Sequence, residues 1–345
     1  MDRCDAGTGV PSVKVSVVIP TYNRAHVVGE AIESALAQTH GNLEAIVIDD
    51  GSTDDTAERV GRLRDPRLRY LGRAHAGVSS ARNAGIAAAT GDLVSFLDSD
   101  DLWKPDKLAA EVAALAGHPA AGGVFSDLEK REGATFVPSF MRSTRVFSRL
   151  LEGHAYPDGL LLSSRALYLC LLQEVPIKTP ALTVRRCALE RVGGFDEGWS
   201  SSEDWEFLLR FARRESLLYL DRPLAVIRVS TDSLRRGDQE RGELTMLRLL
   251  AEERRRLTDR EARRAVAAGI VERAKHLSWY YRDTGRRGAA ARTCLSAFRL
   301  VWDAELLLRA LTVWGPENPR RYLARVWSAR TGSLLWYGML SGSLI

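Results

Sequence analysis

Cysteine and long apolar runs are scarce in this 345-residue sequence. The four cysteines are scattered and show no C-x-x-C spacing, which argues against a disulfide framework or a zinc site. We therefore expect free thiols in a reducing, cytoplasmic environment. No uninterrupted apolar run reaches 18 residues, so we predict no membrane-spanning helix. Residues 1–10 contain charged side chains with no apolar stretch after them, so we expect no secretory signal peptide.

Two glycine-rich phosphate-binding motifs are also absent. The sequence has no G-x-x-x-x-G-K-S/T motif, and no G-x-G-x-x-G follows its first predicted strand. If the protein binds phosphate, a metal ion and side chains such as Arg82 would have to hold it. The 28 glycines and 12 prolines are an ordinary number, which excludes collagen-like and low-complexity classes.

Charge is distributed unevenly along the chain. Residues 1–232 contain 27 basic and 32 acidic residues, a net charge of −5, whereas residues 233–345 contain 22 and 12, a net charge of +10. A chain of this length accommodates about two domains. We therefore predict a flexible N-terminus over residues 1–12, a first domain over 13–232 and a basic helical region over 233–345.

Hydrophobic periodicity predicts alternating strands and helices in the first third of the chain. Apolar and β-branched runs predict strands over residues 13–20, 43–50, 68–71 and 92–98. Helical spacing of apolar residues predicts helices over 24–38, 54–63, 78–89 and 102–115. This order predicts an α/β fold, in which helices flank a mostly parallel sheet.

Polar residues follow three of the predicted strands, at residues 21–23, 49–52 and 98–101. Parallel sheets bind ligands outside the carboxyl ends of their strands, so these residues should share one site. In an extended turn, Asp98 and Asp100 point the same way and can hold Mg²⁺ or Mn²⁺, which prefer oxygen ligands. The alternative is that Asp100 or Asp101 caps a helix that starts near Leu102.

The other two strand ends fit a nucleotide. The Asp50 carboxylate could accept hydrogen bonds from a nucleobase imide or a ribose hydroxyl, and Tyr22 could stack on the base. The alternatives are structural: Gly51 makes a turn, Ser52 or Thr53 caps a helix, and Tyr22 packs on the sheet edge.

Six segments, in this order, resemble the family 2 glycosyltransferases of the GT-A fold. They are residues 15–54 (ending in DDGSTD), 80–85 (SARNAG), 91–101, 179–185, 193–197 (GGFDE) and 203–207 (EDWEF). The resemblance covers roughly residues 13–232, divided into a nucleotide-sugar half (13–126) and an acceptor half (127–232). It implies inverting transfer of a sugar from a nucleotide-sugar, usually a UDP-sugar, with a divalent metal, Mn²⁺ or Mg²⁺. The acceptor would be a hydroxyl on a glycan, a lipid-linked sugar or a metabolite.

The resemblance also implies roles for individual residues. Asp100 would be the main metal ligand, and Asp98 would contact the ribose or the metal. Asp204 would be the general base, with Glu203 as the alternative. The remaining donor-binding residues would be Tyr22 on the uracil, Asp50 on the base, Arg82 and Asn83 near the diphosphate, and Pro20 and Ser99 beside them.

Reaction chemistry explains these residue types. An inverting displacement needs a base on the face opposite the leaving diphosphate, and a metal that neutralises the leaving group. Asp204 also opens an apolar-periodic stretch, where a first-turn acid is favoured by the helix dipole alone. Gly193, Gly194 and Phe195 suggest either an aromatic acceptor platform or a simple helix C-cap. Residues 134–173 show little likeness to the family and could determine acceptor specificity, and Ser230 stands where many relatives carry a metal-binding histidine.

The C-terminal region is helical and rich in arginine. Arg320, Arg321, Arg325 and Arg330 flank aromatic and apolar residues, and residues 331–345 contain no charged side chain. Such a segment can dock on its own domain or lie at the inner face of a membrane as a peripheral contact. No nucleic-acid-binding motif accompanies the charge, so we expect no nucleic acid partner. A second copy of the chain remains a candidate partner.

A second function is compatible with the same residues. Ser230 in place of histidine, together with the basic C-terminal region, suits a non-catalytic subunit that binds sugar-nucleotide or glycan in a membrane-associated glycan-assembly complex. A nucleotidyltransferase is disfavoured, because the chain lacks a glycine-rich triphosphate loop.

Overall fold

The computed structural model describes residues 13–153, 156, 158–229 and 239–313. The chain divides into two compact units, residues 1–238 and 239–345. The domain boundary predicted between residues 232 and 233 falls within residues 230–238, which lie outside the described part of the chain. Ser230 belongs to this segment, and the N-terminal residues 1–12 also lie outside the described part.

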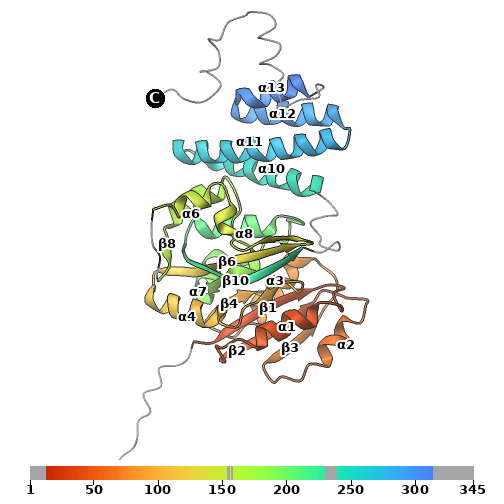
Figure 1. The fold of residues 1–345 in the computed structure, drawn as a ribbon, viewed down its shortest axis with the longest axis vertical. Helices are drawn as coiled ribbons and strands as arrows, with labels where there is room; N and C mark the ends of the chain where they lie inside the picture. Colours follow the sequence, from red (N-terminus) through yellow and green to blue (C-terminus); the bar gives the residue numbers. More distant parts are fainter. Residues whose placement is uncertain (1–12, 154–155, 157, 230–238, 314–345) are drawn as a thin grey trace, which may run out of the picture. The chain divides into compact units, whose positions relative to one another are not determined.

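The described part of the first unit forms one ten-stranded sheet, ordered β3-β2-β1-β4-β9-β6-β10-β5, with β7 beside β6 and β8 beside β10 (Figure 1). Pairing is parallel among β3, β2, β1 and β4 and between β6 and β10, whereas β9 runs antiparallel between β4 and β6. The strands are β1 (Val15–Thr21), β2 (Leu43–Asp49), β3 (Leu68–Gly72), β4 (Leu93–Phe96), β5 (Leu102–Trp103), β6 (Ala121–Glu132), β7 (Thr135–Val137), β8 (Leu160–Leu162), β9 (Leu182–Arg185) and β10 (Ser216–Val229). The predicted α/β fold with a mostly parallel sheet is confirmed, and the antiparallel pairing of β9 makes the sheet mixed.

Three of the four predicted strands are fully buried, since every residue of β1, β2 and β4 is buried, whereas β3 at the end of the sheet is largely exposed. Continuous apolar runs of this kind are what helices on both faces of a parallel sheet require. The helices along this part of the chain are α1 (Val28–Leu36), α2 (Thr56–Gly61), α3 (Val78–Ala88) and α4 (Lys107–Gly117).

Two predicted helix starts were wrong. The helix expected from Leu102 begins at Lys107, because Leu102 and Trp103 form β5, which pairs antiparallel with β10. Pro105 explains the shift, since a proline disfavours helical geometry in the residue before it. Thr53 does not cap α2, which begins at Thr56, where both the backbone N–H and the hydroxyl donate to Asp54.

Residues 121–229 complete the first unit. Helices α5 (Phe147–Leu150), α6 (Ser164–Leu171), α7 (Arg186–Val192) and α8 (Glu203–Ala212) and the 3₁₀ turns η1 (Met141–Ser143) and η2 (Thr179–Ala181) lie between strands of this half. Helix α8 buries its apolar face, which includes Trp205, Phe207 and Phe211. The acids of its first turn stay partly exposed. The acidic first turn therefore has a firmly packed support.

The second unit is helical, as predicted. Its described helices are α10 (Gln239–Arg256), α11 (Arg260–Asp283), α12 (Arg287–Val301) and α13 (Ala304–Thr312). The side chains of Asp259 and Asp303 cap α11 and α13 by accepting from backbone N–H groups. None of the helices that the structure describes is both long and apolar enough to span a membrane. The arginine-rich and uncharged segments predicted to contact a membrane lie in residues 314–345, outside the described part.

Candidate functional site

The carboxyl ends of β1 and β2 meet at one edge of the sheet. Thr21 pairs in register with Asp49, and the loops that follow are tied to each other. The Asn23 backbone N–H donates to Ser52 Oγ (2.8 Å), and Asn23 Oδ1 accepts from the Thr53 N–H (2.8 Å). The predicted donor-binding residue Pro20 is buried in β1 opposite Ile48. These contacts fix the two loops that carry Tyr22 and Asp50.

Tyr22 and Asp50 both contact the loop after β3. The Asp50 side chain is buried and accepts from the backbone N–H groups of Ala76 (3.0 Å) and Gly77 (2.7 Å). The His75 ring lies 2.9 Å from Asp50 through Nδ1 and stacks on Tyr22 with 4.3 Å between ring centroids. His75 was not predicted from the sequence, because nothing in its local pattern indicates this long-range stack.

A cavity of about 380 Å³ adjoins this loop. Its lining is mostly apolar, with two cationic or titratable groups among small side chains: Ile48, Leu71, Arg73, Ala74, His75, Ala76 and Ala84. Pockets with few polar groups among apolar walls are typical small-molecule sites. The cavity therefore lies beside the residues predicted to bind the base, whose roles stay predictions.

The three acids of the 98–101 loop have different surroundings. Asp98 accepts from Arg82 Nη2 (2.8 Å) and from Thr179 Oγ1 (2.9 Å). Asp101 is buried and accepts from the backbone N–H of Arg228 (2.9 Å). Neither Asp100 nor Asp101 caps α4, which begins at Lys107, so the capping alternative was wrong. Ser99, between them, is buried.

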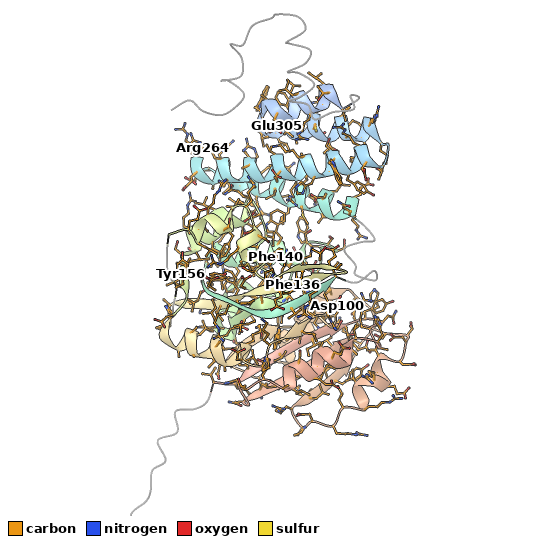
Figure 2. The ribbon with its side chains drawn as sticks, in the orientation of Figure 1. Asp100, Phe136, Phe140, Tyr156, Arg264 and Glu305 are labelled. Atoms are coloured by element: carbon orange, nitrogen blue, oxygen red, sulfur yellow. The ribbon has the colours of Figure 1, made fainter. Side chains whose placement is uncertain are left out.

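Asp100 forms no ion pair with any residue that the structure describes. Burial raises the pKa of the Asp100 carboxyl and the negative charge of Asp98 raises it further, against weaker opposing fields from Arg24 and Arg228. Two carboxylates that repel each other in a partly buried loop, as Asp98 and Asp100 do, are stabilised by a nearby cation. Figure 2 shows Asp100 at the sheet edge, near the end of β10.

Asp98 and Asp100 therefore fit a divalent metal as two oxygen ligands. No group of three His, Cys, Asp or Glu side chains with metal-binding geometry occurs within the described ranges. A two-carboxylate site suits Mg²⁺ or Mn²⁺, because such ions commonly keep waters and take further oxygens from substrate phosphates.

Arg82 connects the acidic loop to α8. Its guanidinium is buried, with 4% of the residue exposed, and donates to Asp98 Oδ1 (2.8 Å) and Glu203 Oε1 (2.7 Å). Burial lowers the pKa of Arg82, but the two carboxylates outweigh burial and keep that pKa above its ordinary value. The Arg82 guanidinium thus contacts both Asp98, which was predicted to bind the donor, and Glu203, which was predicted as the alternative base.

Glu203 and Asp204, the first two acids of the α8 first turn, differ in their contacts. Burial raises the pKa of Glu203, against the opposing attraction of Arg82. Asp204 Oδ1 accepts from the Trp205 backbone N–H (2.8 Å), and the residue is partly exposed. Asp204 makes no ion pair with any residue in the described part of the chain. Both acids are partly exposed, but Glu203 is engaged in an ion pair with Arg82, whereas Asp204 has no ion pair among the described residues.

Asn83 holds the loop after α7. It bonds Phe195 twice, accepting from the N–H (2.8 Å) and donating to the carbonyl oxygen (2.8 Å). Gly194 is required here, because a Cβ would lie 2.3 Å from Asn83 Oδ1. Gly193 is the C-cap of α7 with a φ of 87°, and Phe195 is buried between Phe96 and Phe207. The predicted acceptor platform at Phe195 was therefore wrong, and the C-cap alternative is confirmed.

Thr179 and Arg228 are the other contacts that sequence reasoning did not assign. Thr179 opens one of the family-like segments, so its position carried a signal but no role. Arg228 donates to the Asp100 backbone oxygen through Nε (2.6 Å), across 128 residues of sequence. Contacts at such separations leave no trace in local periodicity.

Comparisons with known proteins identify one family. The model of the family described as Glycosyl transferase family 2 matches residues 16–187. An uncharacterized glycosyltransferase of Rickettsia felis is 34% identical over 218 residues, which cover 63% of this chain and 33% of the relative. The Escherichia coli beta-1,3-glucosyltransferase WfgD is 38% identical over 102 residues, 29% of this chain and 40% of WfgD. The chain therefore spans only about a third of the length of the first of these curated relatives.

Two solved structures share the fold. S. aureus TarS 1–349 in complex with UDP-GlcNAc has a TM-score of 0.61 and 20% identity, over 93% of this chain and 92% of that one. The mannosyltransferase PcManGT from Pyrobaculum calidifontis, in complex with GDP-Man and Mn²⁺, has a TM-score of 0.58 and 22% identity, over 93% and 81%.

Proposed function

Because the chain belongs to glycosyl transferase family 2, we propose that it transfers a sugar, with inversion, from a nucleotide-sugar to an acceptor hydroxyl. The observation that carries this proposal is the Arg82 guanidinium, which bridges Asp98 of the donor-side loop and Glu203 of the α8 first turn. This contact joins the two halves that a displacement reaction needs: a donor site and a base.

We take the donor to be a UDP-sugar. Tyr22 would offer a ring for the base, and Asp50 is already fixed by two backbone N–H groups at the neighbouring strand end. TarS, a neighbour in fold, was solved with UDP-GlcNAc, and PcManGT with GDP-Man. The choice of UDP over GDP therefore rests on the resemblance and is open to direct measurement.

Asp204 is our general base. Glu203 would have to give up its ion pair with buried Arg82 before it could take a proton, whereas Asp204 has only a hydrogen bond to its neighbour. A base must reach the acceptor hydroxyl directly or through one water, which favours the carboxylate that is not held in an ion pair. Glu203 then serves to hold α8 in place through Arg82.

Asp98 and Asp100 would hold a divalent metal. When bound, such an ion neutralises negative charge on the leaving diphosphate. The contribution of this chain is to keep two carboxylates side by side at the sheet edge, one oriented by Arg82 and Thr179 and the other left to the cation.

The acceptor is proposed only as a class. WfgD acts on alpha-D-GlcNAc-diphosphoundecaprenol, and the chain matches it over 102 residues. A hydroxyl on a lipid-linked sugar, a glycan or a metabolite is therefore the acceptor class to examine, with lipid-linked sugars first.

Measurement of UDP release from UDP-glucose and UDP-GlcNAc, with and without acceptors, tests this function. We expect Asp204→Asn to lower turnover about 10²- to 10⁴-fold, because the base is lost. Asp100→Ala should lower it at least about tenfold by removing a metal ligand. Asp55→Asn is the matched control, because Asp55 is exposed and makes no side-chain cap bond.

The outcomes separate the two candidate functions. Wild-type turnover in both Asp204→Asn and Asp100→Ala would refute the assigned roles. Tight UDP binding by calorimetry, without turnover of either donor by the wild type across an acceptor panel, would favour the non-catalytic binding subunit.

A further inference from the structure

Arg228 connects three segments at the end of β10. Its Nε donates to the backbone oxygen of Asp100 (2.6 Å), and its own backbone N–H donates to the Asp101 carboxylate (2.9 Å). Its Nη1 forms an ion pair with Glu30 in α1. Arg228 thus joins the acidic loop, the long strand β10 and helix α1.

The strand beneath Arg228 is a rigid support. Strand β10 pairs with β6 as far as Val229, and Arg228 lies opposite Arg131 in that register. The loop it holds leaves the sheet at Phe96, the last residue of β4, and has no further strand pairing up to β5. Arg228 therefore holds the acidic loop to β10, because the pairing of strand β4, from which the loop emerges, ends at Phe96.

The acids of the loop are held in different ways. Asp98 is oriented through its side chain by Arg82 and Thr179, and Asp101 through its side chain by the Arg228 N–H. Asp100 is held through its main chain, by Arg228 Nε. This arrangement fixes the backbone position of Asp100 and leaves the oxygens of its carboxylate available to a ligand.

The guanidinium is constrained at two of its three nitrogens. Nε binds Asp100 and Nη1 pairs with Glu30, whereas Nη2 is buried and has no partner among the described residues. Buried donors are rarely left unpaired. The contacts with Asp100 and Glu30 therefore determine how the guanidinium is oriented, and Nη2 is left without a hydrogen bond to the described residues as a result. A planar guanidinium can make this two-way connection, whereas a lysine ammonium is a single point charge.

We propose that Arg228 is a positioning residue for Asp100: it clamps the acidic loop to β10 and α1, and so sets the geometry in which Asp98 and Asp100 bind metal and donor diphosphate together. This inference rests on the proposed function. A merely structural Arg228 would affect stability alone, whereas a positioning residue changes how strongly UDP affinity depends on metal.

Calorimetry with UDP, at saturating Mn²⁺ and in the presence of EDTA, provides that readout for the full chain. We expect Arg228→Ala to weaken UDP binding roughly 10- to 100-fold with Mn²⁺, as loss of an outer-shell contact does at metal sites. Binding with EDTA should change less than about twofold, because the base-binding residues are untouched. Arg228→Lys should retain part of the effect.

Two further variants sharpen the test. Glu30→Ala removes the far anchor of the guanidinium at an exposed position, and should weaken Mn²⁺-dependent binding about two- to fivefold. Arg222→Ala is the matched control, because Arg222 lies on the same strand and pairs with Asp106 at the surface. It should leave UDP binding unchanged under both conditions.

Each outcome has one meaning. Equal Mn²⁺-dependent affinities for the wild type and a folded Arg228→Ala variant would overturn the positioning role and leave the proposed function standing. A wild type that does not bind UDP under either condition would overturn the proposed function, and the inference with it. A melting temperature lowered in Arg228→Ala, with metal dependence intact, would also overturn the positioning role.

Discussion

Two charge clusters with opposite designs lie beside β4 and β9. The inner cluster lies within the sheet and its helix cover: Lys107 pairs with Glu111 at 2.8 Å, both side chains are 0% exposed, and Ser95 and Thr183 complete the network. The outer cluster lies at the strand ends, where Arg82 meets Asp98 and Glu203. The inner cluster has one cation for one acid, and the outer has one cation for two.

This difference in charge balance suits the inner cluster to a structural role and the outer cluster to binding and catalysis. The inner pair is neutral and closed to solvent, and Lys107 Nζ also lies 4.2 Å from the centre of the Trp103 ring. It fixes α4 against the strands and leaves no group for a ligand. The outer cluster has a net negative charge beside the accessible acids Asp100 and Asp204, which suits a cation and a proton acceptor.

The largest effect is expected from Arg82→Met. Removal of the buried guanidinium leaves the partly exposed carboxylates of Asp98 and Glu203 without their cation, and loss of the two ion pairs together should cost about 3–5 kcal/mol of the free energy of unfolding. Sugar transfer should fall as well, because the acidic loop and α8 lose their connection. Urea unfolding and UDP release measure both, with the exposed Arg62→Met as control. A variant with wild-type stability and turnover would contradict the role given to Arg82.

A smaller net effect is expected at the inner cluster when both partners are changed. Lys107→Met alone leaves Glu111 buried without its cation and should cost about 3 kcal/mol. The double change Lys107→Met/Glu111→Met should recover most of that loss, since apolar residues of similar volume often replace buried ion pairs without penalty. Turnover should survive in the double variant. If the double variant were as unstable as the single one, or inactive, the contrast between the clusters would fail.

The smallest effect of a single substitution is expected at the opposite edge of the sheet, from Glu44. Burial alone would raise the pKa of Glu44, but hydrogen bonds from Ser16, Thr90 and Arg69 outweigh it and lower that pKa from 4.5 to about 2. Because the folded pKa is depressed, Glu44 stabilises the fold above about pH 4.5, and this contribution is lost as the pH falls towards 2.

Glu44→Gln should therefore lower the free energy of unfolding by roughly 2 kcal/mol at pH 7 and flatten its decline between pH 4.5 and 2. Denaturant unfolding at several pH values measures this slope. A variant with the wild-type slope would show that other carboxylates carry the acid sensitivity.

Sequence periodicity was sufficient to predict strands β1 to β4 and the mostly parallel sheet, but not strands β5 to β10. Strands β1, β2 and β4 are mostly apolar and fully buried, and the polar residues that follow them, at 21–23, 49–52 and 98–101, were predicted to share one edge. The helix start near Leu102 failed because Trp103 is drawn into the core: its ring is buried and its Nε1 donates to the Pro180 oxygen (2.7 Å). Tertiary contacts overrode local helical spacing there.

Partners of the site residues could not be predicted in the same way. Arg82 and Glu203 are 121 residues apart, and Arg228 and Asp100 are 128 apart, so neither pair leaves a local pattern. Residue type could suggest that Arg82 binds phosphate, but only the fold shows that both terminal nitrogens already contact carboxylates. The roles of Pro20, Tyr22, Asp50, Asn83, Ser99 and the acids stay predictions.

The central claim is that the acids of the 98–101 loop and of α8 form one site around a metal-bound nucleotide. Anomalous diffraction from a crystal soaked with UDP and Mn²⁺ tests it most directly. We predict one Mn²⁺ peak in coordination contact with the Asp100 carboxylate, with the uracil on Tyr22 and Asp204 facing the open side of the diphosphate. A nucleotide bound away from residues 98–101, with no Mn²⁺ beside Asp100, would contradict the account.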